Sequence, residues 1–250
     1  MGEYLLFRLY GLMASWGDIA VGEHRPSFAH PSKSAILGLV AAAVGLTRDS
    51  DEAQRELAQA YGFAVRVDVP GFLLRDYHTV QVPSSGTGRN RRTFATRKEE
   101  LEVPGEELNT ILSSRDYRCD AVYTVCLWAL RGSPPYTLKD MAERLRVPVF
   151  VLYLGRKSCP PALPLQPVLV TADTVRQAFE GASFRDGEDL KGIPEGKLVA
   201  VYWEGAEESG YVKVHSITRR DIPLNRQRWQ FADREEHYGV AGSMAQSREE

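Results

Sequence analysis

The run Asp120–Leu130 (DAVYTVCLWAL) is the most strand-like part of this chain of 250 residues. It is rich in Val, Tyr, Thr and Trp, and no charged residue follows Asp120, which is typical of a strand in the middle of a sheet. A helix is predicted next, over Thr137–Arg146, because its apolar residues recur every three or four positions. Another strand is predicted directly after it, over Val147–Leu154.

The residues before the central run repeat this pattern. A strand is predicted at Tyr4–Tyr10, and the apolar run Ala35–Leu46 predicts a buried helix that Ser32 or Ser34 caps. A second helical pattern then leads to a strand at Phe63–Val69. Strand, helix, strand, strand, helix, strand is the βαββαβ order of a ferredoxin-like domain. The sequence therefore predicts an α+β fold of this kind.

A basic excursion, Arg75–Lys98, interrupts the order between the second and third strands. It holds six arginines and lysines against one acid, in a chain whose formal net charge is -2. Extended-looking pieces at Tyr77–Val82 and Thr93–Thr96 enclose a Gly- and Ser-rich tip, which predicts a long β-hairpin. Clustered cations among aromatic residues favour a polyanion with flat faces, such as a nucleic acid. A solvated surface loop is the alternative.

Beyond Pro160 the composition changes to Pro-rich loops, a short helix at Thr174–Phe179, and strands near Lys197–Trp203 and Tyr211–Ile217. We therefore expect two domains. Residues 1–160 would form the ferredoxin-like domain with the basic insertion at 75–98, and residues 161–250 a smaller C-terminal β-containing lobe with a tail.

The composition argues against several classes of protein. The longest apolar run is too short to span a bilayer, and no signal peptide is visible at the start, so we expect a cytoplasmic protein without membrane contact. The three cysteines form no C-x-x-C pair, and the carboxylates are scattered. We expect neither a metal site nor a cofactor.

Two further segments are candidates for phosphate binding. In the loop after Tyr153, Gly155 allows a close approach of the backbone, and Arg156 and Lys157 supply cations. The loop is not a Walker motif, and a turn with two solvated cations is the alternative. The second segment is the predicted helix start at Ser32–Ser34, which includes Lys33 and offers free N–H groups.

Trp16 and the early histidines have two interpretations each. Trp16 can stack on a base or pack in the core. His24, His30 and Lys33 are the candidates for acid–base chemistry in a metal-independent ribonuclease, although ordinary loop histidines are the simpler interpretation.

Four motifs, in this order, resemble one known family. They are the L-x-G-x-x-x-x-W-G of Leu9–Gly17, the P-S-K-S-x-x-x-G-L of Pro31–Leu39, the R-D-Y-H-T of Arg75–Thr79, and the segment Tyr153–Pro160. They are similar to the Cas-five family of the RAMP superfamily, in the form found in the type I-E CRISPR surveillance complex, Cascade. The resemblance covers roughly residues 1–240.

The resemblance implies a RAMP ferredoxin-like domain with a protruding β-hairpin thumb. It also implies that the chain grips the 5′ handle of the CRISPR RNA and caps the backbone filament, in contact with the backbone subunit, the large subunit and a target DNA strand near the thumb. The residues implied for the handle are Trp16, Lys33, Ser34, Arg75, Tyr77, His78, Arg156 and Lys157. Those implied for the thumb are Arg89, Arg91 and Arg92.

Catalysis is not expected. Some type I-C members of the family cut the precursor RNA, whereas in type I-E systems another subunit does so, and the motifs resemble the I-E form. No catalytic residue is therefore assigned. A metal-independent endoribonuclease that processes precursor CRISPR RNA stays the alternative, and a protein scaffold without RNA contact is a third.

Overall fold

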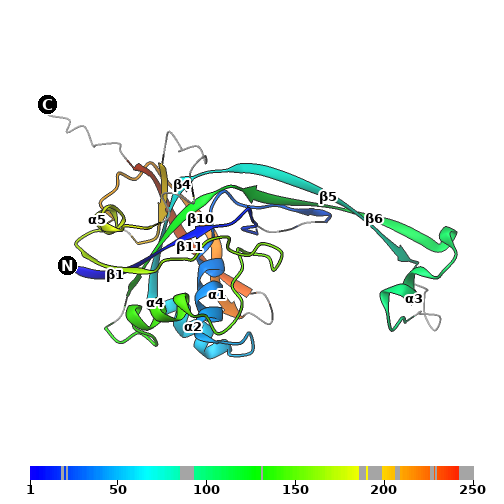
Figure 1. Ribbon diagram of the computed structural model, residues 1–250, viewed down its shortest axis with the longest axis horizontal. Helices are drawn as coiled ribbons and strands as arrows, with labels where there is room; N and C mark the ends of the chain where they lie inside the picture. The colour runs from blue at the N-terminus through cyan, green and yellow to red at the C-terminus, as the bar shows by residue number, and fades with distance from the viewer. Residues whose placement is uncertain are drawn as a thin grey trace.

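A seven-stranded antiparallel sheet forms the body of the protein, and a long two-stranded arm projects from it (Figure 1). This computed structural model describes residues 1–17, 20, 22–84, 93–130, 132–185, 190, 199–205, 209–225, 228 and 230–241. All the pairings between neighbouring strands of the large sheet are antiparallel.

The N-terminal part contributes three adjacent strands of this sheet. They are β1 (Gly2–Tyr10), β7 (Val122–Ala129) and β4 (Tyr61–Val69), with β7 in the middle. The strand predicted at Asp120–Leu130 is confirmed by β7, which lies between two neighbours, and this position explains why its residues are almost all apolar.

The prediction of a strand at Val147–Leu154 is wrong. None of residues 147–154 pairs with a strand, and Val151 is 84% exposed. The backbone of this segment instead packs on the end of the first helix, where the N–H groups of Val149 and Phe150 donate to carbonyls of that helix. The position beside β1 is taken by a later strand, β8 (Val168–Ala172).

The C-terminal strands extend the same sheet on its other side. Strand β9 (Val199–Trp203) pairs with β4, β11 (Gln230–Ala241) pairs with β9, and β10 (His215–Asn225) forms the edge. The strands on both sides of residue 160 therefore belong to one sheet, whose order is β10-β11-β9-β4-β7-β1-β8. Strand β11 was not predicted from the sequence.

Helices cover both faces of this sheet. One hydrophobic cluster lies under α1 (Lys33–Val44), α2 (Asp51–Ala60) and α4 (Leu138–Arg146). The other cluster lies on the opposite face, under α5 (Val175–Gly181). Figure 1 shows α1, α2 and α4 together on one side of the strands. The α+β class is thus confirmed.

Helix α1 begins at the predicted cap but ends at Val44, two residues before the end of the predicted run Ala35–Leu46. The Ser32 side chain accepts from the backbone N–H of Ala35, as an N-cap does, so the first of the two proposed caps is confirmed. Its C-cap is Gly45, whose φ of 86° lies in the left-handed region that favours glycine.

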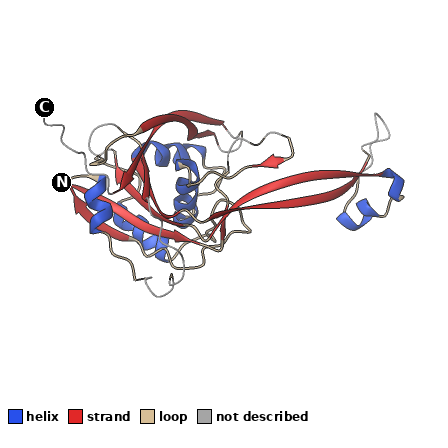
Figure 2. Cartoon of the chain, turned by 90° about the horizontal axis from the view of Figure 1, so that it is seen from above, coloured by secondary structure: helices blue, strands red, loops and turns tan. Residues whose placement is uncertain are grey.

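The arm is a two-stranded antiparallel ribbon, shown lengthwise in Figure 2. Its strands are β5 (Phe72–Pro83) and β6 (Leu108–Cys119), and they pair without a break from Phe72–Cys119 to Pro83–Leu108. At the base the chain turns sharply through Gly71, which has a φ of 60°. A Cβ there would lie 2.1 Å from the carbonyl oxygen of Cys119, so the tight entry into the arm requires glycine.

The hairpin prediction located the first strand of the arm correctly and the second one wrongly. Residues 93–96 form no strand; a short helix α3 (Arg97–Leu101) follows them at the far end of the arm, and then a 3-10 turn (Gly105–Glu107). The returning strand begins only at Leu108. Two short strands, β2 (Met13–Ala14) and β3 (His24–Arg25), pair with β6 near the body.

Within the described residues, no helix is long and apolar enough to cross a membrane. The same residues contain no group of three or more His, Cys, Asp or Glu side chains placed to hold a metal ion. The three cysteines are buried and free, as expected for core residues.

Candidate nucleic-acid interface

The two faces of the arm carry different side chains. Because residues directly opposite in an antiparallel pair point to the same face, Arg75, Tyr77 and Thr79 share one face with their partners on β6. Tyr77 is 62% exposed, and none of the strands that the structure describes covers it. Residues 76 and 78 point to the opposite face. The first face therefore offers an aromatic ring to solvent beside an arginine.

Arg75 is held at the base of the arm by a buried carboxylate. Its Nε and Nη2 donate to the two oxygens of Asp116, at 2.8 and 3.1 Å. His24 Nε2 lies 3.0 Å from Asp116 Oδ2. The hydrogen bond from Arg75, together with that from His24, outweighs the effect of burial and holds the pKa of Asp116 below its usual range. Asp116 therefore stays ionised and fixes the direction of the guanidinium.

His78, which was also predicted to bind RNA, lies on the opposite face. Its Nε2 pairs with Asp76, two residues earlier on the same strand. Both side chains are partly exposed. The pair is therefore accessible, but it faces away from Tyr77.

The loop after Tyr153 packs on the base of the arm. The guanidinium of Arg156 lies over the ring of Tyr117, 4.9 Å from its centroid, and Lys157 is exposed beside it. Gly155, with a φ of 85°, faces the chain itself, because a Cβ there would lie 1.8 Å from the carbonyl oxygen of Ser15. The close approach predicted for this glycine is thus made by the protein's own backbone.

Two of the predicted handle-binding side chains are buried. Trp16 is 1% exposed and packs edge-on against Tyr123, with ring centroids 5.5 Å apart. Lys33 is 3% exposed, and its Nζ lies 2.5 Å from Glu204 Oε1. Neither side chain is accessible to a ligand in this conformation, and the core-packing interpretation of Trp16 is the one the structure supports.

The start of α1 is also occupied. The backbone N–H of Lys33 donates to Asp221 Oδ2 at 2.9 Å, which places a carboxylate of the protein where phosphate binding was expected. Ser34 lies 3.0 Å from the Ser32 hydroxyl and lines a groove of about 1130 Å3 along α1. The groove also includes Phe150 and Tyr153. Arg89, Arg91 and Arg92 lie outside the described residues.

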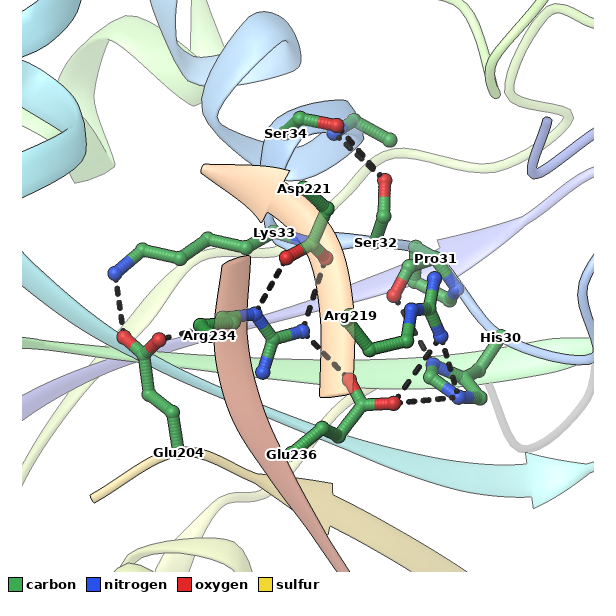
Figure 3. Close-up of polar contacts among 11 residues, drawn as sticks. His30, Pro31, Ser32, Lys33, Ser34, Glu204, Arg219, Asp221, Arg234 and Glu236 are labelled. Atoms are coloured by element: carbon green, nitrogen blue, oxygen red, sulfur yellow. Dashed lines mark hydrogen bonds and ion pairs between the residues drawn. The ribbon is translucent and has the colours of Figure 1, made fainter. Parts of the chain in front are cut away.

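Lys33 belongs to a buried charge network that joins α1 to the C-terminal strands (Figure 3). Arg234 donates to both oxygens of Asp221, at 2.7 and 3.0 Å, and to Glu236 at 2.6 Å. Glu236 also accepts from Arg219 at 3.1 Å. The network holds three cations and three carboxylates: Lys33, Arg219 and Arg234 with Glu204, Asp221 and Glu236.

His30 also belongs to the network, and its burial makes it a poor candidate for acid–base chemistry. It is buried, its Nδ1 donates to the Pro31 carbonyl, and its Nε2 lies 3.3 Å from Glu236. Burial by itself opposes ionisation of Glu236, but His30, Arg234 and Arg219 outweigh it and lower the pKa of this carboxyl to about 2. His30 and Lys33 are therefore buried structural residues, and their polar side chains are paired with Glu236 and Glu204.

Comparisons with known proteins agree with this architecture. The family profile described as CRISPR-associated protein (Cas_Cas5) matches residues 4–236. The chain belongs to the Cas5 family. It is 30% identical to the CRISPR system Cascade subunit CasD of Escherichia coli (strain K12), with 98% of each chain covered. The resemblance derived from the four sequence motifs is thereby confirmed.

Two solved structures are similar to this Cas5-family chain. A chain of a CRISPR RNA-guided surveillance complex aligns with a TM-score of 0.62 and 28% identity, covering 95% of this chain and 89% of that one. A crystal structure of a Cas protein aligns with a TM-score of 0.61 and 26% identity, covering 95% and 94%.

Sequence reasoning missed three residues at the base of the arm of this Cas5-family protein. They are Arg25, Arg115 and Asp116. The misplaced second strand of the hairpin hid the last two, because residues 108–119 were not recognised as part of the arm. Arg25 lies on a two-residue strand, too short for any periodic signal.

Proposed function

We propose that this chain is a non-catalytic, RNA-binding subunit of a type I-E Cascade complex. In this proposal it grips the 5′ handle of the CRISPR RNA, caps one end of the backbone filament and contacts the backbone and large subunits. Family membership and the printed names of its relatives support assembly into such a complex. The observation that carries RNA binding is the exposed Tyr77 beside Arg75 on an uncovered arm.

The strand order supports a ferredoxin-like core for this role. Strands β8, β1, β7 and β4 are neighbours and follow the βαββαβ order along the chain. The arm then corresponds to the thumb of RAMP proteins, inserted between the second and third strands. A target DNA strand near the thumb belongs to the same proposal.

The predicted handle residues divide into three groups under this proposal. Five offer accessible side chains at the arm and its base: Arg75, Tyr77, His78, Arg156 and Lys157. Ser34 remains a candidate through the groove along α1. Trp16 and Lys33 act through the fold, by packing and by ion pairing.

Removal of the Tyr77 ring tests the proposal. In a complex reconstituted with CRISPR RNA, Tyr77→Ala should weaken RNA binding by about fivefold or more, because stacking on one base contributes about 1–3 kcal/mol. Leu169→Ala is a matched control, since Leu169 is an exposed apolar residue on β8. An affinity equal to that of the control, together with no RNA crosslink to residues 75–83, would contradict RNA binding by the arm.

The contact between His24 and Asp116 favours the endoribonuclease alternative. His24 is partly exposed and is oriented by Asp116, as a general base is oriented in many acid–base sites. Incubation of the full chain with repeat RNA in EDTA distinguishes the two functions. A product ending in a 2′,3′-cyclic phosphate that disappears in His24→Ala would overturn the non-catalytic proposal.

A further inference from the structure

Three arginines from separate segments meet on the face of the arm opposite to Arg75 and Tyr77. Arg25 on β3 is in register with Arg115 on β6, so the two side chains leave neighbouring strands on the same face. Two positions further along β6 on this face is Tyr117, and Arg156 lies over its ring. Arg156 Nη2 lies 3.5 Å from the carbonyl oxygen of Arg25. We call these residues the arm-base cluster: Arg25, Arg115 and Arg156.

The guanidinium groups of the arm-base cluster lack direct ion-pair partners among the residues that the structure describes. The carboxylate in register with Arg115 is Asp76, which is paired with His78 instead. Like charges gathered in one place repel one another, and a bound anion removes that cost.

The cluster is also partly oriented in advance. Arg25 Nη1 donates to the carbonyl oxygens of Gly22 and His24, at 2.5 and 3.2 Å. The ring of Tyr117 supports Arg156, and Tyr117 itself is buried, so it supports a cation and is not available to stack on a base. Side chains held in place lose less conformational entropy when they bind a ligand.

We propose that the arm-base cluster binds the phosphates of single-stranded RNA. Guanidinium groups suit this anion because they donate two parallel hydrogen bonds to phosphate oxygens. Contacts of this kind to the sugar–phosphate backbone carry no base identity, so the cluster would position the RNA. The inference rests on the proposed function and deepens it: RNA lies against both faces of the arm base, with bases at Tyr77 and phosphates at the cluster.

The salt dependence of RNA binding tests this inference. The full chain, in the reconstituted complex, is titrated with a labelled single-stranded RNA that carries the handle, at several salt concentrations. Each Arg→Gln change in the cluster should weaken binding by about tenfold at fixed salt and reduce the slope of log K against log salt by about 0.7. The triple variant should lose about 2 from that slope. Arg55→Gln, on the exposed face of α2, is the matched control and should change neither quantity.

A neutral RNA backbone identifies the group that the cluster contacts. Methylphosphonate linkages at the handle should weaken binding to the wild-type chain and have little further effect on the triple variant, because the contact is already lost. Arg115→Lys keeps the charge and removes the paired hydrogen bonds, so it should retain the salt slope and lose affinity. Thermal unfolding checks that each variant is folded, and this lysine variant serves if the triple variant is not.

The outcomes separate this inference from the proposed function. If the wild-type chain retains RNA and the triple variant shows the same affinity and slope, the cluster is not a phosphate site, and RNA binding by Tyr77 stands. If the triple variant instead dissociates from the other subunits with unchanged RNA affinity, the cluster binds an acidic protein surface and the inference is wrong. If the wild-type chain retains no RNA at all, the proposed function fails first.

Discussion

Arginines in the body and at the base of the arm have opposite electrostatic surroundings. In the buried network, Arg219 and Arg234 contact carboxylates at 2.6 to 3.1 Å, and the network has equal numbers of cations and carboxylates. In the arm-base cluster, three arginines meet without a carboxylate partner among the described residues. The difference shows which arginines hold the fold. A buried charge needs a partner of opposite sign. An accessible charge does not, because water solvates it, and it is therefore available to bind a ligand.

The largest expected effect comes from breaking the buried network. Glu236→Gln removes the carboxylate that Arg219, Arg234 and His30 share, and leaves two buried guanidinium groups short of an anion. We expect the free energy of unfolding to fall by about 3–5 kcal/mol. Urea denaturation at pH 7, monitored by circular dichroism, measures it.

Asp233→Asn is the control on the same two strands. It breaks the exposed ion pair between Asp233 and Arg220, and the free energy of unfolding should barely change because water screens this pair. Equal losses in the two variants would mean that burial does not distinguish these ion pairs, and the comparison would break.

Acid should remove the same contribution without any mutation. The pKa of the Glu236 carboxyl is lowered from 4.5 to about 2 in the fold, so its contribution is complete above about pH 4.5 and is lost as the pH falls toward 2. At 1.36 kcal/mol for each tenfold change in the ionisation constant, this amounts to about 3 kcal/mol. The stability difference between wild type and Glu236→Gln should therefore shrink over this range. A constant difference from pH 6 to pH 2.5 would refute it.

The smallest expected effect concerns Arg75, the arginine at the base of the arm that does have a carboxylate partner. Asp116 neutralises Arg75, so Asp116→Asn should turn a paired arginine into an uncompensated one. We expect RNA binding to become a few times tighter at low salt, with the slope of log K against log salt steeper by about 0.7. Glu56→Gln, on the exposed face of α2, shows whether the loss of any carboxylate does the same. A slope that stays at the wild-type value would mean that Arg75 already contacts phosphate in the presence of Asp116.

Local sequence patterns correctly predicted the helices and strands that pack mainly against elements close in sequence or against the apolar core. Strands β1, β4 and β7, the helices α1, α2 and α4, and the cap at Ser32 all followed from periodicity and composition. The same reasoning failed at Val147–Leu154, because an apolar run has a strand pattern whether or not a neighbour is free to pair with it. The edge of β1 was already taken by β8.

The candidate site divides in the same way. The sequence alone determined that cations and an aromatic residue gather in one excursion, and that four motifs belong to the Cas5 family. It could not show that Lys33 and His30 are buried, since their partners Glu204 and Glu236 lie far along the chain. Nor could it bring Arg25, Arg115 and Arg156 together. Only the tertiary structure decided which charges are paired, because ion pairing depends on distances of a few ångströms between segments that sequence order leaves unrelated.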